Sequence, residues 1–504
     1  MNHKEWLLAD KNIQYRTINA MIKEHIVSEG MRIKEGTRKV EIFLNDHLLS
    51  LKVARKSALK RYVFTGDIVL ENKKLSQSVE SLEELLQILT EIFHINISKR
   101  LYDELIHSRD SLYETYKHFY NRQTLIHQSM KFSKLPDSIN FIAWLQHLQD
   151  SGITDDLSYS ESLVIEGHPT HPLTKTKLPL STNELKLYAP EFEKVIPLNI
   201  MLIEKNHVVT TAINDDQNFI LNQVIPEYRD RLKCYLEPLR LNLNDYRVML
   251  IHPWQYDHTI GEQFEEWIAK KILLPTPFTV ESKATLSFRT MDLIHTPYHV
   301  KLPVNVQATS AVRTVSSVTT VDGPKLSHAL QGLLQEFPEL QVAMEPFGAY
   351  AHTATDLSKQ LALIIRQKPT IYDYGCTVVT ASLVNPNPID NQAVVDSYLK
   401  WIENEITLDH IKHFIAIYTQ TLVTPLIAYI QNYGMALEAH MQNTIVNLGP
   451  NYKMKFIVRD LGGSRIDLNT LKQKVPQIDV TNESLIADTI EEVIAKFQHA
   501  VIQN

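Results

Sequence analysis

Cysteine and glycine are both scarce in this chain of 504 residues, and each shortage excludes a class of site. The two cysteines, Cys234 and Cys376, lie far apart and lack metal-ligand spacing, which excludes a disulfide scaffold and a cysteine-based zinc site. The 14 glycines form neither a G-x-x-x-x-G-K-[ST] loop nor a G-x-G-x-x-G turn. Any nucleotide bound here is therefore held by side chains rather than by a glycine-rich phosphate loop.

Signals for secretion, membranes and nucleic acids are also missing. The N-terminus lacks the apolar region of a signal peptide, and the most apolar long segment, 414–430, is interrupted by Thr, Gln and Pro. We therefore expect that segment to fall short of a membrane span. A net charge of -7 without a basic stripe argues against a nucleic-acid partner. With 44% hydrophobic and 22% charged residues, the chain is expected to be a cytoplasmic globular protein of several domains.

The hydrophobic pattern predicts mixed helices and strands along the chain. After an opening helix and several β-rich runs, a helix is expected at 81–97, where Ser81 and Glu84 have the spacing of a capping box. Further helices are expected at 393–406 and 408–433. The expected strands are 39–44, 48–54, 62–70, 246–251, 361–366, 444–448 and 453–458.

Residues 287–313 carry the main concentration of polar chemistry in the sequence. Apolar and polar residues alternate from His299 to Gln307, which predicts one strand with its valines packed inward. Its polar residues Lys301, Asn305 and Gln307 would then point together into a cleft. The flanking polar residues are Ser287, Arg289 and Thr290 before the strand, and Thr309, Ser310 and Arg313 after it. Cations and hydroxyls in one place suit a polyphosphate or a polycarboxylate, and the alternative is a half-exposed strand with ordinary salt bridges.

Two further segments contain candidate ligands. In EGHPTHPLTK (166–175), each proline pushes the preceding histidine towards extended geometry, so His168 and His171 are expected on a loop. A third and fourth zinc ligand are absent at usable spacing, which argues against a zinc site. The alternative to a ligand-binding loop is a surface loop that the prolines stiffen. Near the C-terminus, a predicted hairpin brings Asn443 close to Asp460, and a carboxylate with an amide oxygen is a common Mg²⁺ arrangement. The alternative is that Asp460 caps a turn and His440 belongs to the core.

Taken in order, six motifs resemble those of the NRPS-independent siderophore (NIS) synthetases, the aerobactin-synthetase-like IucA/IucC family. The matching segments are EGHPTHPLTK (166–175), HPWQ (252–255), SFRT (287–290), KLPVNVQATSAVRT (301–314), LEAHMQN (437–443) and RDLGG (459–463). The resemblance implies an α+β fold shaped like a cupped hand. Its parts would be an N-terminal thumb (1–150), β-rich fingers (151–380) and a mainly helical palm with the metal-binding hairpin (381–504).

The resemblance also implies a reaction and a set of site residues. Members use Mg-ATP to adenylate a carboxylic acid, most often citrate, and condense it with an amine, releasing AMP and pyrophosphate. ATP binding would fall to Ser287, Arg289, Thr290, Lys301, Thr309, Arg313 and Glu438. The carboxylate would be bound by His168, His171, Ser310, Arg313 and His440, and Mg²⁺ by Glu438, Asn443 and Asp460. Lys301, Arg313 and His440 are the predicted catalytic residues, because joining two anions requires positive charge and the amine requires a base.

Partners and alternatives follow from the same resemblance. We expect a homodimer, small-molecule acid and amine substrates, and other synthetases of the same pathway as possible partners. Members generally extend tens of residues beyond the end of this chain, so the palm is expected to be shortened. The alternative function is therefore a non-catalytic or partner-dependent form that binds nucleotide or metabolite and regulates or scaffolds a full-length synthetase. A kinase-like phosphotransferase, which would release ADP, is a third hypothesis.

Overall fold

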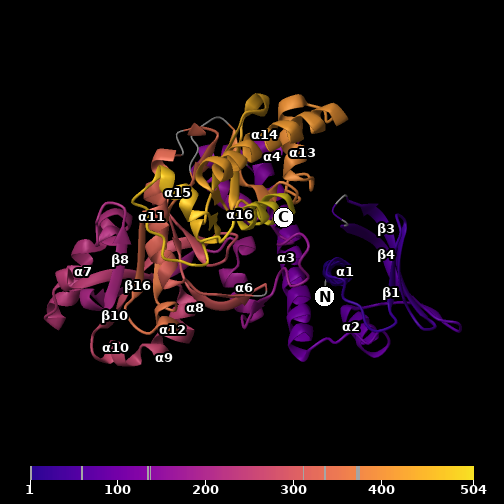
Figure 1. The fold of residues 1–504 in the computed structure, drawn as a ribbon, viewed down its shortest axis with the longest axis horizontal. Coiled ribbons are helices and arrows are strands. Elements are labelled where there is room, and N and C mark those ends of the chain that lie inside the picture. The colour runs from indigo at the N-terminus through magenta and orange to yellow at the C-terminus, as the bar shows by residue number, and fades with distance from the viewer. Residues whose placement is uncertain are drawn as a thin grey trace. The chain divides into compact units, whose positions relative to one another are not determined.

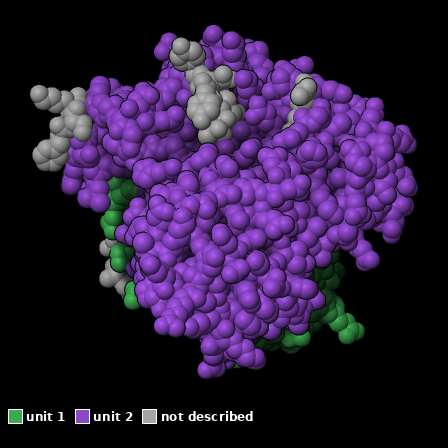
Figure 2. All heavy atoms as spheres, turned by 90° about the vertical axis from the view of Figure 1, so that its left-hand side faces the viewer, with its two compact units in different colours: residues 1–122, 165–185, 306–311 green, residues 123–164, 186–305, 312–504 purple. Residues whose placement is uncertain are grey.

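The computed structural model describes residues 3–57, 59, 61–132, 135–136, 138–309, 311–333, 336–369 and 375–503. The chain forms two compact units, drawn in different colours in Figure 2. Unit 1 comprises residues 1–122, 165–185 and 306–311, and unit 2 comprises residues 123–164, 186–305 and 312–504. The division into thumb, fingers and palm stays a prediction.

Unit 1 is built on an antiparallel meander. Its described residues form a five-stranded sheet whose strand order follows the sequence. The strands are β1 (Arg32–Glu35), β2 (Lys39–Leu44), β3 (His47–Lys56), β4 (Tyr62–Glu71) and β5 (Ser76–Ser78). The helices are α1 (His3–Lys23), α2 (Leu82–Glu91) and the first part of α3 (Lys99–Phe132). The predicted cap of α2 is confirmed at Ser81, which accepts from the N–H of Glu84 (3.2 Å), but Glu84 in turn accepts from Glu80 (2.7 Å) rather than from Ser81.

Unit 2 contains the largest sheet among the described residues, with eight strands in the order β8-β16-β17-β12-β11-β10-β7-β9. All of its neighbouring strands are antiparallel. The strands are β7 (Ile196–Glu204), β8 (Val208–Ala212), β9 (Tyr246–Ile251), β10 (Leu273–Ala284), β11 (Thr290–Leu293), β12 (Tyr298–Lys301), β16 (Phe347–Ala351) and β17 (Ala362–Gln367). The accompanying helices are α7 (Arg229–Leu236), α8 (Pro253–Gln255), α9 (Gly261–Gln263), α10 (Glu265–Ala269), α11 (Ser317–Leu333) and α12 (Thr355–Ser358).

A second sheet of unit 2, with four strands in the described residues, has the order β15-β21-β20-β18. These strands are β15 (Leu340–Val342), β18 (Cys376–Val379), β20 (Thr444–Leu448) and β21 (Met454–Val458). Around it lie α4 (Phe141–Asp150), α5 (Asp156–Glu161), α13 (Val394–Glu403), α14 (Leu408–Tyr433), α15 (Leu468–Lys474) and α16 (Ile490–Phe497). The sheets are antiparallel except for the parallel pair β15–β21, and together with the helices they confirm the predicted α+β class. The predicted hairpin is confirmed, since Thr444 pairs with Val458 and Leu448 with Met454.

The single strand predicted from His299 to Gln307 is wrong. The structure divides it into β12, in the eight-stranded sheet, and β13 (Val304–Ala308), which belongs to a small sheet with β6 (Lys177–Leu178) and β14 (Ala311–Arg313). Pro303 lies at the break, where it has no N–H to donate to a ladder. Thr309 leaves the strand with a φ of +58°. The alternation therefore does not place Lys301 and Gln307 in one row.

Helix α14 corrects a second expectation. It is the one helix in the described ranges that is long and apolar enough to cross a membrane, whereas the sequence predicted that its apolar run would fall short. One of its faces is buried against the main core of unit 2, through Leu422, Leu426, Tyr429 and Tyr433 among others. Core helices commonly combine such length with such composition, so this feature alone is weak evidence for a span.

Helix α11 packs closely on the large sheet beside β8 and β16 (Figure 1). The contact is tightest at Gly348 of β16, where a Cβ atom would lie 2.0 Å from the backbone oxygen of Thr320. Backbone cannot move aside as a flexible side chain can, so only glycine allows this approach. The close packing of α11 on the sheet therefore requires a residue without a side chain at position 348.

We expect Gly348→Ala to lower the free energy of unfolding by at least about 2 kcal/mol, because the added methyl group forces α11 away from the sheet. Chemical denaturation measures the change. The matched control is Gly261→Ala, since a Cβ at Gly261 meets nothing within 4 Å. Equal stability of the two variants would contradict the packing argument.

Candidate functional site

The candidate site begins at the buried polar face of strands β11, β12 and β17. In the register of these strands, Thr290 pairs with Lys301, Asp292 with His299, and His299 with Arg366. Directly paired residues of antiparallel strands place their side chains on the same face. All five side chains are buried, while the intervening apolar residues pack into the core on the opposite face. The middle of the sheet therefore carries charge on one side and a hydrocarbon core on the other.

Asp460, which follows β21, meets this polar face directly. Both of its carboxylate oxygens accept hydrogen bonds from Nζ of Lys301, each at 2.8 Å. Burial alone raises the pKa of the Asp460 carboxyl, but Lys301 and two nearby guanidinium groups outweigh burial and hold that pKa well below its usual range. Lys301 and Asp460 are thus in direct contact as an ion pair, in which Lys301 is buried and Asp460 is part-buried.

A second ion pair continues from Asp460 into the interior. Arg366 lies with Nη2 3.6 Å from Oδ1 of Asp460 and donates to Oε1 of Glu345 at 2.8 and 3.1 Å. Oε2 of Glu345 is buried and has no hydrogen-bond partner among the described residues. Arg366 therefore forms an internal ion pair with Glu345 and also reaches Asp460. Glu345 was not predicted, since it belongs to no motif and lies in a loop 21 positions before its partner Arg366.

Two more arginines, Arg289 and Arg313, lie close enough to interact electrostatically with the Asp460 carboxylate. Burial lowers the pKa of the Arg289 guanidinium to about 10, with the charge of Asp460 acting in the opposite direction. Arg289 donates to the backbone oxygen of Thr314, and within the described part of the chain no carboxylate oxygen lies within 4.0 Å of it. Burial also lowers the pKa of Arg313, against the charges of Asp460 and Glu438. Arg289, a half-buried cation with no adjacent carboxylate among the described residues, is a good binding group for an anion.

The turn that carries Arg289 explains the S-x-R-T motif. Oγ of Ser287 accepts from the N–H of Thr290 (3.1 Å), and Phe288 takes a φ of +69°. A positive φ is strained for a bulky residue, and such strain occurs most often at functional sites. The hydroxyl of Thr290 is buried without a hydrogen-bond partner among the described residues. Ser287 therefore shapes the turn, and whether it also contacts a ligand stays a prediction.

The loop before β20 brings the third group of predicted residues to the hairpin. Nδ2 of Asn443 donates to the backbone oxygen (3.3 Å) and to Oε2 (3.4 Å) of Glu438, and the backbone oxygen of Asn443 accepts from the N–H of Arg459 (2.9 Å). The predicted proximity of Asn443 to the Asp460 end of the hairpin is thus confirmed. Burial lowers the pKa of His440, against the charge of Glu438, so the imidazole is neutral near pH 7 and able to accept a proton.

A buried ion pair that the sequence did not predict joins these segments. Arg459 donates to both carboxylate oxygens of Glu161, at 2.5 and 3.1 Å, and to the backbone oxygen of Gln442 (2.8 Å). Glu161 also accepts from the N–H of Leu286 (2.7 Å). The Glu161–Arg459 pair therefore connects the turn at 286–290 with the loop at 438–443. No local spacing signals it, because its two residues are 298 positions apart.

The remaining predicted residues belong to unit 1. In the loop 166–175, Nδ1 of His171 accepts from the N–H of Leu173 (3.0 Å), and Arg16 donates to the backbone oxygen of His168. The N–H of Thr309 donates to the backbone oxygen of Thr176 (3.2 Å), so the structure brings Thr309 to the end of this loop. Ser310 lies outside the described residues. Roles of these residues in ligand binding stay predictions.

The candidate metal ligands in unit 2 suit a metal ion that is bound together with substrate phosphates. In the part of the chain that the structure describes, no group of three or more His, Cys, Asp or Glu side chains is placed to hold a metal ion. Glu438, Asn443 and Asp460 supply two carboxylates and an amide oxygen. Mg²⁺ characteristically binds one or two carboxylates and completes its shell with water and substrate phosphates. The residues therefore fit Mg²⁺ bound together with a polyphosphate.

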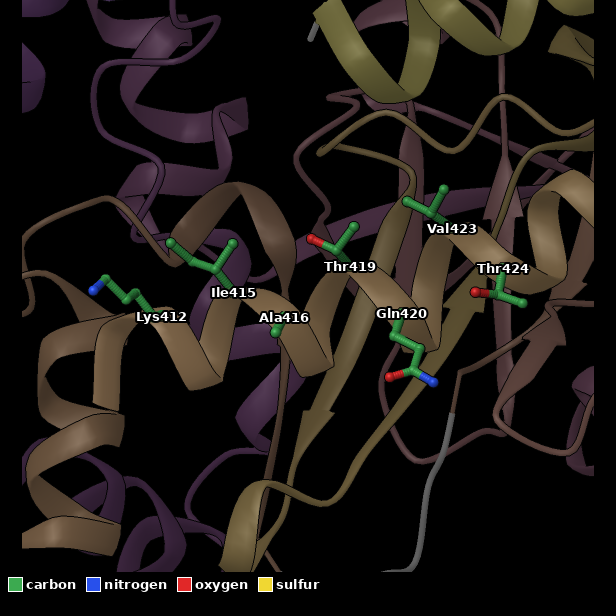
Figure 3. A pocket seen from close by; sticks show the side chains of 7 residues that line it. All are labelled: Lys412, Ile415, Ala416, Thr419, Gln420, Val423 and Thr424. Carbon is green, nitrogen blue, oxygen red and sulfur yellow. The ribbon is translucent and has the colours of Figure 1, made fainter. Parts of the chain in front are cut away.

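A surface hollow on α14 is unrelated to this chemistry. It has a volume of about 490 Å³ and is lined by one face of the helix, from Lys412 to Thr424 (Figure 3). None of the residues predicted from the motifs lines it, and Lys412 is its one charged side chain. Its composition does not suit an anionic ligand.

Two family models match separate parts of the chain. Residues 156–385 match the model of the IucA / IucC family, and residues 412–504 match a model described as a ferric iron reductase FhuF-like transporter. Staphyloferrin A synthase of Staphylococcus aureus is 63% identical over 504 residues, which cover 100% of this chain and 86% of that protein. The D-ornithine–citrate ligase of the same organism is 24% identical, over 99% of this chain and 80% of its own length.

Solved structures share the fold. The petrobactin biosynthesis protein AsbB of Bacillus anthracis matches with a TM-score of 0.78 at 16% identity, covering 99% of this chain and 85% of that one. The ATP-bound aerobactin synthetase IucA of Klebsiella pneumoniae matches with a TM-score of 0.74 at 18% identity, covering 98% of this chain and 85% of that one.

The Glu161–Arg459 pair generates a stability prediction. Arg459→Met is expected to cost about 3–5 kcal/mol in the free energy of unfolding, because it leaves the buried Glu161 carboxylate unpaired. The double variant Glu161→Met, Arg459→Met is expected to be more stable than Arg459→Met, since neither charge is then buried alone. Denaturant unfolding of both variants and of Glu161→Met completes the cycle. If the free-energy losses of the two single variants simply add in the double variant, this would contradict the pairing.

Proposed function

This chain belongs to the IucA/IucC family of NIS synthetases, and from that membership we propose that it is an ATP-dependent acid–amine ligase of siderophore synthesis. Citrate is the proposed acid, because the relatives include a protein named as a citrate ligase. The 63% identity to a staphyloferrin A synthase, over the whole chain, supports a product of the same class. The observation that carries the chemistry is the meeting of cationic strand and acidic hairpin at Lys301 and Asp460.

In the proposed first step, a carboxylate oxygen of citrate attacks the α-phosphorus of ATP. The bond to the β-phosphate oxygen breaks, pyrophosphate leaves, and a citryl-adenylate results. Two anions must approach each other, so the step needs a site that is already positive and requires little rearrangement. Lys301, Arg289 and Arg313 supply that charge from buried or half-buried positions. The ATP-bound state of a synthetase with this fold supports the choice of nucleotide.

In the proposed second step, the nitrogen of an uncharged amine attacks the acyl carbon. The acyl–phosphate bond breaks, AMP leaves, and the amine gives up a proton as the amide forms. His440, which burial keeps neutral, is suited to accept that proton. When bound at Glu438, Asn443 and Asp460, Mg²⁺ would neutralise phosphate charge.

The rival functions receive less support. A non-catalytic scaffold would not need two carboxylates and Asn443 gathered beside three cationic side chains. The kinase-like hypothesis rests on the hairpin alone, and the family membership gives it no support. The segment that matches the FhuF-like model contributes Glu438, Asn443 and Asp460, so we interpret it as part of the synthetase. A homodimer, a partner synthetase and a cytoplasmic location stay predictions.

The decisive experiment is citrate-dependent exchange of labelled pyrophosphate into ATP by the full chain. Exchange is expected with citrate or a citryl monoamide and with Mg²⁺, and it should be lost when EDTA removes the metal. Hydroxylamine trapping of the activated acid gives an independent reading. An absence of exchange with citrate, citryl monoamides, 2-oxoglutarate and succinyl half-amides would refute the ligase.

Arg289→Met separates function from stability in this site. We expect exchange activity to fall at least about 100-fold, because removing one charge-stabilising group typically costs 10² to 10³ in rate. The melting temperature should stay the same or rise, because no carboxylate oxygen of the described residues lies within 4.0 Å of the half-buried Arg289 guanidinium. Lys472→Met, an exposed lysine on α15, is the control. Arg289→Met with wild-type activity would remove Arg289 from the site.

Lys301 is a less suitable position for that test. Its removal leaves the part-buried Asp460 carboxylate without its closest partner, so Lys301→Ala is expected to lose both activity and stability. Arg313 is half-buried, and Arg313→Ala should therefore abolish exchange with a smaller change in melting temperature.

A further inference from the structure

The C-terminal helix α16 places a cation beside the acidic loop. Nζ of Lys496 lies 2.5 Å from Oε1 of Glu438, and the two side chains are 18% and 25% exposed. Lys496 belongs to none of the six motifs, and no role was predicted for it. The charge of Lys496 also reaches His440, whose pKa it lowers in addition to the larger effect of burial. Lys496 therefore lies among residues that the proposed reaction uses.

Backbone hydrogen bonds fix the distance between α16 and Glu438. The strand that precedes Glu438, β19 (Met435–Ala436), pairs with β22 (Arg465–Ile466). Ile466 in turn forms a bridge with Ile486, and its backbone oxygen accepts from the N–H of Ala487 (2.9 Å). The start of α16 is thus held to the same short ladder as the start of the loop.

Helix α16 is also held by its own cap and core. Oγ1 of Thr489 accepts from the N–H of Glu492 (3.4 Å) at the N-terminus of the helix. Val493 and Phe497, which flank Lys496 along the helix, are buried in the main core of unit 2. The amine of Lys496 therefore reaches Glu438 from a fixed backbone, with its aliphatic stem against the protein.

The other oxygen of Glu438 has different surroundings. Oε2 lies 3.4 Å from Nδ2 of Asn443, and a Cβ atom on Gly463 would come within 1.8 Å of it. Glycine at 463 thus gives the carboxylate room beside the turn that follows Asp460. With Oε1 bound to Lys496, Oε2 is the oxygen that lies beside Asn443, another of the proposed metal ligands.

We propose that Lys496 is a positioning residue of the ligase, which holds Oε1 of Glu438 so that Oε2 is presented to the Mg²⁺-nucleotide. The inference rests on the proposed function, in which Glu438 is a ligand of Mg-ATP. A hydrogen-bonded partner that orients a metal-binding carboxylate typically contributes 10- to 100-fold to affinity or activity. Lys496 would act through Glu438 and have no contact with phosphate.

The test compares nucleotide binding with and without metal in the full chain. Calorimetry of Lys496→Met should show affinity for Mg-ATP weakened by about tenfold or more, while affinity for ATP in EDTA changes less than about twofold. Lys496→Arg should recover affinity for Mg-ATP to within about threefold, because it keeps the charge. Lys472→Met, on the exposed side of α15, should match the wild type in both titrations. In a Glu438→Gln background, Lys496→Met should have no further effect.

Four results would overturn the inference. Equal weakening of Mg-ATP and metal-free ATP would mean that Lys496 contacts phosphate itself. Unchanged affinity of Lys496→Met, or an equal loss in Lys472→Met, would mean that it has no specific role. Binding is measured apart from turnover, so a wild type that binds Mg-ATP but shows no citrate-dependent exchange refutes the ligase and leaves the role of Lys496 decided by the titrations. A wild type that does not bind Mg-ATP refutes both.

Discussion

The buried pair of Lys301 and Asp460 is the interaction on which the candidate site depends. Taking a carboxylate and an ammonium group out of water costs several kcal/mol for each ion, and their attraction offsets this cost only with good geometry. Here both carboxylate oxygens accept from the same amine at 2.8 Å, and Arg366 lies 3.6 Å from one of them. The pair joins strand β12 to the end of hairpin β20–β21, so it also fixes where the acidic loop lies against the sheet. Asp460 keeps a φ of +73° in this position, a strained conformation that its contacts must stabilise.

The surroundings of that pair contradict local rules of stability, as functional sites often do. A central strand face normally packs hydrocarbon, yet this one buries Asp292, His299, Lys301 and Arg366. Arg289 is half-buried with no adjacent carboxylate among the described residues, and partial removal from water lowers its pKa to about 10. The opposite face of the same sheet already provides a continuous apolar core. The simplest physical reason for keeping such costly groups is an anionic ligand that compensates them when it binds.

How much the sequence could predict depended on how far apart the interacting residues lie. Hairpin β20–β21 was predictable because its turn and its two β-rich runs are adjacent, and the proximity of Asn443 to the Asp460 end followed from it. The break at Pro303 was missed because the apolar alternation continues on both sides of it, and periodicity does not report a change of sheet. Glu161 and Lys496 were missed because each acts through a tertiary contact, and only the fold brings them to Arg459 and Glu438. The motifs thus located the site, while the residues that hold it in place required coordinates.

The ion pair between Lys301 and Asp460 affects which form of the nucleotide binds. Lys301 is the cation that a phosphate would bind, and its partner Asp460 is a carboxylate that Mg²⁺ would bind. A bare polyphosphate that takes Lys301 leaves Asp460 buried beside added negative charge, and a bare metal ion leaves Lys301 beside added positive charge. A metal-bound nucleotide gives both residues a new partner at once. Phosphate replaces Asp460 as the partner of Lys301, and the metal replaces Lys301 as the partner of Asp460, so no unpaired charge is left in the interior. The ion pair therefore favours the nucleotide–metal complex over either component, because the cost of separating Lys301 from Asp460 is offset only when both receive a new partner.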